Sequence, residues 1–211
     1  MTTSYVSTNW SGYMATTGNY TAITGSWTVP HATGITGKTS DDSAWIGIGG
    51  VTAADLIQVG TEDSVSASGR EKSVAFYELL PQTAHTISTL SISAGDSMSA
   101  SLSETTANQW KISITDTTTG GSFVTTVSYT SSHSSAEWIE EDPSSAGGLI
   151  PFDTFTPILF TNATTTSSTT SDTILSSNAQ PVTLISGTTH NTLATPSGIG
   201  SDGQSFTITR D

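Results

Sequence analysis

The stretch Ala136-Glu-Trp-Ile-Glu-Glu-Asp-Pro143 holds the side chains best suited to acid–base chemistry. Four of its eight residues are acidic, whereas charged residues make up only 11% of the 211-residue chain. If the stretch is a β-strand, side chains alternate between faces, so Glu137, Ile139 and Glu141 share one face. Two carboxylates around an apolar residue could serve a general acid or base. The alternative is a solvated acidic strand edge without a function.

Two further polar residues interrupt apolar, strand-like segments. Gln58 lies within Leu-Ile-Gln-Val (56–59), and Glu78 lies within Phe-Tyr-Glu-Leu (76–79). Gln58 could simply face solvent, and Glu78 could be a partly buried acid whose oxygens are satisfied by hydrogen bonds. Either residue becomes a candidate for function only if it shares a cleft with Glu141.

The segments that must position these residues have the period of β-strands. Short alternating runs such as 111–115 recur between Gly- and Pro-containing turns, and no amphipathic helix or long repeat is present. The pattern predicts an all-β fold of two packed antiparallel sheets. No change in composition marks a second domain, so a single domain is expected over residues 1–211. The Ser/Thr-rich residues 161–173 are expected to form a long loop or an irregular edge.

Composition excludes several classes of partner. The formal net charge is −13, with 18 acidic residues against five basic ones. Nucleic acid and anionic membrane surfaces are therefore not expected as partners, because binding them requires Lys and Arg. No apolar run reaches the length of a membrane span. A chain with so few cations has few salt bridges that acid could break, so acid tolerance is expected.

Residue types also limit the cofactors. The sequence contains no cysteine, which removes disulfides, thiolate nucleophiles and Cys-based metal sites. The four histidines show no metal-ligand spacing, so neither a metal nor another cofactor is expected. The first residues lack the basic and apolar regions of a signal peptide, and Met1 is interpreted as the start of a recombinant or trimmed mature chain.

Six segments in order stand out, and together they span most of residues 8–160. They are Asn9-Trp-Ser-Gly12, Ser26-Trp-Thr-Val-Pro30, Ala44-Trp-Ile-Gly-Ile48, Leu56-Ile-Gln-Val-Gly60, Phe76-Tyr-Glu78 and Ala136-Glu-Trp-Ile-Glu-Glu-Asp142. Together they resemble the glutamic peptidases, also called eqolisins or peptidase family G1, and Ala-Glu-Trp-Ile-x-Glu at 136–141 is the most specific of them. Gly49, Val74 and Leu80 stand where the fungal pattern has Asp, Asp and Tyr, and with the missing cysteines this resembles a prokaryotic branch.

The resemblance implies a fold and a set of site residues. The fold would be an antiparallel β-sandwich of two bent sheets, of the concanavalin-like or jelly-roll type. By motif position the catalytic pair would be Gln58 and Glu141. The neighbouring residues that bind substrate or support this pair would be Trp45, Glu78, Gly12 and Glu62.

The resemblance also implies a reaction that these residue types can carry out. Glu141 would accept a proton from water, and the amide of Gln58 would donate to the developing oxyanion. We expect hydrogen bonds to the charged form of Glu141 to keep it ionised in acid. The expected protein is a secreted, monomeric, acid-active endopeptidase that cleaves polypeptides.

Two other functions fit the same residues. A glycoside hydrolase on a curved sandwich would use Glu78 and Glu141 as its two carboxylates. Trp10, Trp45 and Trp138 would then stack on sugar rings. A non-catalytic sandwich, either a carbohydrate-binding module or a cell-surface domain, also suits the acidic, Ser/Thr-rich composition.

Overall fold

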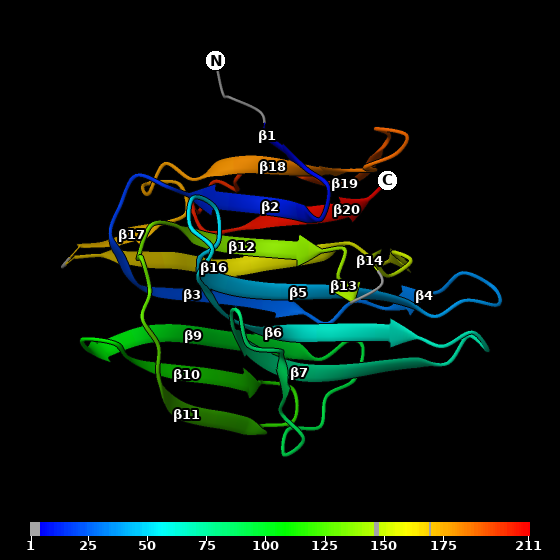
Figure 1. Cartoon of the computed structure of the whole chain (residues 1–211), viewed down its shortest axis with the longest axis horizontal. Helices are drawn as coiled ribbons and strands as arrows, with labels where there is room; N and C mark the ends of the chain where they lie inside the picture. Colours follow the sequence, from blue (N-terminus) through cyan, green and yellow to red (C-terminus); the bar gives the residue numbers. More distant parts are fainter. Residues whose placement is uncertain (1–4, 146–147, 169) are drawn as a thin grey trace.

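The computed structural model describes residues 5–145, 148–168 and 170–211, which form 20 β-strands and no helix (Figure 1). The strands of the first half are β1 (Tyr5–Ser7), β2 (Trp10–Ala15), β3 (Tyr20–Thr28), β4 (Ala32–Thr33), β5 (Ser40–Gly49), β6 (Leu56–Val65), β7 (Glu71–Leu79), β8 (His85–Thr86), β9 (Ser97–Thr106) and β10 (Gln109–Asp116). Those of the second half are β11 (Ser122–Ser128), β12 (Ala136–Glu141), β13 (Ser144–Ser145), β14 (Gly148–Leu149), β15 (Thr154–Phe155), β16 (Ile158–Ser167), β17 (Thr170–Thr173), β18 (Gln180–Ile185), β19 (Thr192–Pro196) and β20 (Phe206–Arg210).

The strands make two packed layers. The first runs β8-β7-β6-β5-β12-β2-β18, and the second runs β11-β10-β9-β3-β16 behind it (Figure 1). Strand β16 pairs with β3 through residues 161–167 and with β20 through residues 158–160, so the sheet continues from one layer to the other. The pairings between long strands are antiparallel, and β1 joins β18 in parallel. The predicted all-β antiparallel sandwich is therefore confirmed.

The main core lies between the layers. Alternation along β5 and β6 turns Ile46, Ile48 and Val59 inward, where they pack with side chains of the second layer such as Trp27 and Trp110. All five are at most 2% exposed. Burying one aliphatic side chain of this size contributes about 1.5–3 kcal/mol, so this interface supplies the main driving force for holding the layers together.

The opposite, outer face of the first layer carries a second apolar cluster. Its buried members come from β2, β5, β6, β7, β12 and β18, and they are Met14, Trp45, Leu56, Phe76, Ile139 and Val182. The strands that bear the candidate site are therefore fixed by packing on both faces.

Gly12 allows β2 to lie close against β12. It stands opposite Ile139 on β12 and Val182 on β18. A Cβ atom added there would come within 2.0 Å of the Trp138 carbonyl oxygen, and the φ of +145° is one that residues with side chains rarely adopt. A glycine is therefore required at this position to bring β2 alongside the strand that ends at Glu141.

Of the two expectations for residues 161–173, the long loop is wrong. The irregular edge is closer, because the pairing of β16 with β3 shifts register within this tract and β17 joins β16 off the main strand order. Most of this tract forms the end of β16 and the strand β17, and residues 164–167 pair with residues 170–173. Threonine favours strands because its branched side chain fits a pleated surface. Ala163 and Thr165 alternate into the interior, and the Thr165 hydroxyl donates to the Ala22 carbonyl at 2.8 Å. The low hydrophobicity of this tract suggested a loop, but threonine hydroxyls that hydrogen-bond the backbone can be buried in a strand.

No described residue belongs to a helix that could cross a membrane.

Candidate active site

Gln58 and Glu78 form one row on the outer face of the first layer. They lie directly opposite each other on β6 and β7, and residues opposite each other in an antiparallel pair share a face. The Gln58 Nε2 atom donates to Glu78 Oε2 at 2.5 Å. The row continues through Gly47 on β5 to Glu137 on β12. The structure therefore joins the two polar residues that interrupt the apolar segments of β6 and β7.

Glu141 lies on the same face in a parallel row. Its neighbours across β5 and β6 are Ser43 and Glu62, so Glu62 belongs to this row rather than to that of Gln58. The row of Trp45 runs between the two. Gln58 and Glu141 thus share one face, on opposite sides of Trp45, and no hydrogen bond joins them within the described part of the chain.

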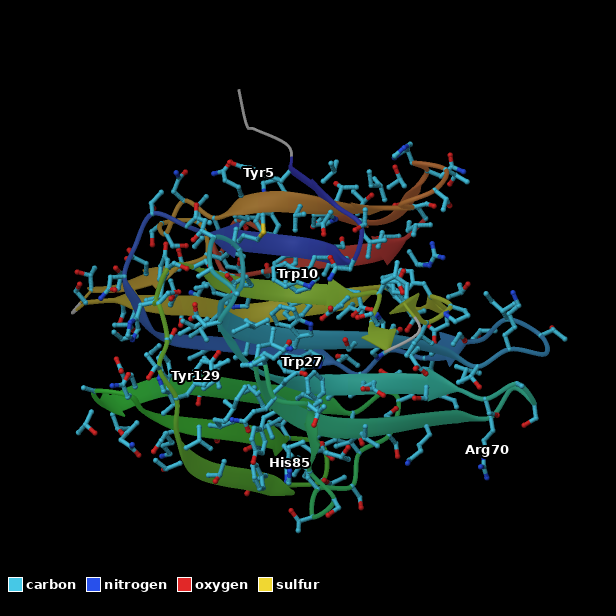
Figure 2. All side chains as sticks on the ribbon, in the orientation of Figure 1. Tyr5, Trp10, Trp27, Arg70, His85 and Tyr129 are labelled. Carbon is cyan, nitrogen blue, oxygen red and sulfur yellow. The ribbon has the colours of Figure 1, made fainter. Side chains whose placement is uncertain are left out.

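The carboxylate of Glu141 is held by two side chains from neighbouring strands. The Trp45 indole Nε1 donates to Oε2 at 2.8 Å, and Asn9 Nδ2 donates to Oε1 at 3.2 Å. Trp45 is fully buried, so its polar atom faces this carboxylate and not solvent. Trp10 lies at the start of β2 (Figure 2). Its ring packs edge-on against that of Trp45, with ring centroids 5.1 Å apart.

Burial raises the pKa of Glu141 to about 7, although the N–H groups of Trp45 and Asn9 oppose the rise. The donors that we expected to favour ionisation are therefore present, but desolvation outweighs them. Burial thus works against the ionised form of Glu141 that these donors favour. Burial likewise raises the pKa of Glu78 and of Glu62.

Exposure separates Glu141 from its acidic neighbours. Glu137 shares its face but is 0% exposed, and Glu140 is also 0% exposed on the opposite face, as strand alternation predicts. Burial raises the pKa of both well above the usual range. Glu141 is partly exposed, so of these three acids it is the one that a substrate can reach.

Glu140 belongs to a group of buried acids between the layers. The four carboxyls of Asp42, Asp63, Glu140 and Asp153 are at most 1% exposed. Both side-chain oxygens of Asp42, of Glu140 and of Asp153 lack a hydrogen-bond partner among the described residues. In the part of the chain that the structure describes, no group of three or more acidic or His side chains is arranged to hold a metal ion. Neutral, protonated carboxyls are the form that such an interior tolerates.

Two residues near the site were not identified from sequence. Asn9 opens the segment Asn-Trp-Ser-Gly (9–12) that the resemblance covers, but only the fold shows that its amide reaches Glu141 across 132 residues of chain. The Tyr129 hydroxyl makes hydrogen bonds to Leu56 at the start of β6 and to Leu80 after the end of β7. No sequence pattern predicts this role.

The fold of this chain is similar to that of solved glutamic peptidases. The scytalido-glutamic peptidase, crystallised with a transition-state analogue inhibitor, superposes with a TM-score of 0.82 at 24% identity, covering 98% of this chain and all of that one. The aspergilloglutamic peptidase of Aspergillus niger gives a TM-score of 0.72 at 30% identity, covering 82% of this chain and 99% of that one. Together these likenesses confirm the fold that the resemblance implied.

The model of the Peptidase A4 family matches residues 8–210, and the chain belongs to that family. Aspergillopepsin-2 of Aspergillus niger is 32% identical in an alignment of 183 residues that covers 76% of this chain. The match spans 65% of the length of that relative. The resemblance to glutamic peptidases stated from the motifs is thereby confirmed.

Proposed function

We propose that this chain is an endopeptidase in which Glu141 activates a water molecule and Gln58 stabilises the oxyanion. Membership of a peptidase family supports hydrolysis of peptide bonds over the glycosidase and binding-module alternatives. The observation that carries the assignment of residues is the exposure of Glu141, held by Trp45 and Asn9, on the face that also bears Gln58.

The proposed reaction uses the carboxylate of Glu141 and the amide hydrogen of Gln58 that does not bond Glu78. Ionised Glu141 accepts a proton from water as the water oxygen attacks the peptide carbonyl carbon. One amide hydrogen of Gln58 bonds Glu78, which leaves the second hydrogen for the oxyanion. Protonated Glu141 then returns the proton to the leaving nitrogen when the C–N bond breaks. Every proton is accounted for without a covalent intermediate.

We further propose that Glu62 and Glu78 add acidic character to this face, and that Trp45 and Gly12 act by positioning the strands and the Glu141 carboxylate. Activity should lie on the acid side of neutrality. At low pH the activity is limited because little Glu141 is ionised. At high pH it is limited because the buried acids become charged and destabilise the fold. We infer a secreted, monomeric, single-domain peptidase over residues 1–211, without a cofactor and with polypeptides as its substrates.

Replacing Gln58 by alanine should reduce cleavage of a denatured protein by about 10²- to 10³-fold, the usual loss for one oxyanion donor. Circular dichroism and the melting temperature check that the variant is folded. Gln109→Ala is the matched control, because that amide bonds Ser128 at the exposed side of β10. Assays on β-glucan and xylan run alongside. Undiminished proteolysis by folded Gln58→Ala, or cleavage of either polysaccharide, would contradict the proposal.

Replacing Asn9 by alanine should move the acid limb of the kcat/KM profile to higher pH. Asn9 donates to the carboxylate, so its loss destabilises the ionised form and raises the pKa of Glu141 further. The measurement is the pH dependence of peptide cleavage. Asn162→Ala, which removes an amide bonded to Ser26 instead, should leave the limb in place. A limb that stays fixed in Asn9→Ala means that Glu141 is not the group whose ionisation limits the reaction.

A further inference from the structure

Tyr129 connects the two strands that carry Gln58 and Glu78. It follows β11 at the start of the connection that leads to β12 (Figure 2). Its hydroxyl accepts a hydrogen bond from the Leu56 N–H at 2.8 Å and donates to the Leu80 carbonyl at 2.9 Å.

These bonds close a ring of hydrogen bonds at the ends of β6 and β7. The Leu80 N–H donates to the Leu56 carbonyl at 2.9 Å. The Tyr129 hydroxyl therefore bonds the remaining N–H of Leu56 and the remaining C=O of Leu80. Leu56 begins β6 two residues before Gln58, and Leu80 follows β7 two residues after Glu78. The ring thus lies next to the bonded pair Gln58–Glu78.

Tyr129 is itself anchored in the second layer. Its N–H donates to the Asn108 carbonyl at 3.0 Å, and its carbonyl accepts from Trp110 Nε1 at 3.1 Å. Trp110 is 0% exposed in the main core. The residues that follow reinforce the connection, because the Ser132 N–H donates to Asp55 Oδ2 at 2.7 Å. Tyr129, held in the second layer, therefore fixes the start of β6 and the end of β7 in the first layer.

We propose that Tyr129 is a positioning residue that holds Gln58 and Glu78 in register for catalysis. The inference rests on the proposed function of Gln58. An amide aimed at an oxyanion must be held closely, since a displacement of about 1 Å can cost about 10²-fold in rate. Without the hydroxyl, the Leu56 N–H and the Leu80 C=O lose their partner, and the ends of β6 and β7 are free to shift.

The experiment is a double-mutant cycle between Tyr129→Phe and Gln58→Ala. In the wild-type background we expect Tyr129→Phe to lower kcat by on the order of 10- to 100-fold with little change in KM. In the Gln58→Ala background the same substitution should change kcat by less than about twofold, because the amide that it positions is gone.

Tyr13→Phe is the matched control. It removes a tyrosine hydroxyl that donates to the Ser197 carbonyl at 2.8 Å, away from the ends of β6 and β7. The inference is overturned by full activity of folded Tyr129→Phe, by an equal loss of kcat in both backgrounds, or by an equal loss in Tyr13→Phe. Wild-type activity of Gln58→Ala is a different result, which rejects the proposed function itself.

Discussion

Raising the pH from about 4 to about 8, across the shifted pKa values of its buried acids, is expected to destabilise this protein severely. Burial raises the pKa of Asp63 and of Asp153 to about 7, and at Asp63 a hydrogen bond from Ser73 opposes the rise. Burial, followed by the charges of neighbouring acids, raises the pKa of Glu140 and of Asp42 well above the usual range.

The direction of the effect follows from proton binding. Between the unfolded pKa of about 4 and these raised values, the folded state binds more protons than the unfolded state, so the free energy of unfolding falls as pH rises. The contribution is complete below about pH 4 and is lost as the pH passes through the folded pKa values. A carboxyl shifted by about three pKa units accounts for on the order of 4 kcal/mol. Losing a contribution of this size removes a large part of a domain's usual stability of about 5–15 kcal/mol.

The measurement is the melting temperature as a function of pH. Glu140→Gln, which mimics the protonated acid, should melt within a few degrees of the wild type in acid and roughly 5 °C or more above it near neutral pH. Asp172→Asn removes an exposed carboxyl that bonds Ser176 and should show no such difference. If the wild-type melting temperature stays constant or rises from acid to neutral pH, the buried acids are not protonated in the folded state.

Replacing Glu141 by glutamine should abolish peptide hydrolysis at every pH. The amide keeps the shape of the side chain but cannot accept a proton from water, so the base step is lost. Substrate binding should persist, because the substitution leaves the surrounding face in place. Turnover of a denatured protein by the folded, purified variant is the measurement, with peptide binding measured separately.

Glu140→Gln is the matched control for this substitution too. Glu140 lies one residue away but is buried between the layers, whereas Glu141 is partly exposed on the outer face. Glu140→Gln should therefore retain turnover at acid pH. If Glu140→Gln is inactive while Glu141→Gln works, the catalytic carboxylate lies on the other face. If both variants cleave peptide, the glutamic peptidase mechanism is excluded.

The sequence by itself determined the fold class and the identity of the candidate residues. Alternation within 136–141 separated Glu141 from Glu140, because side chains in a strand must point to opposite faces. Apolar context distinguished Gln58 and Glu78 for the same local reason. The tract 161–173 was misjudged because the hydrogen bonds that bury its threonines come from β3, which is remote in sequence.

Only the tertiary structure decided the environment of those residues. Solvation and hydrogen bonding depend on strands far apart in the chain, so no local pattern could show that burial raises the pKa of Glu141 despite the donors of Asn9 and Trp45. The same holds for the buried acids, which lie on β5, β6 and β12 and in the segment before β15. Tyr129 lies 73 residues from Leu56, and its role becomes visible only when the packing of the two layers brings its hydroxyl to the ends of β6 and β7.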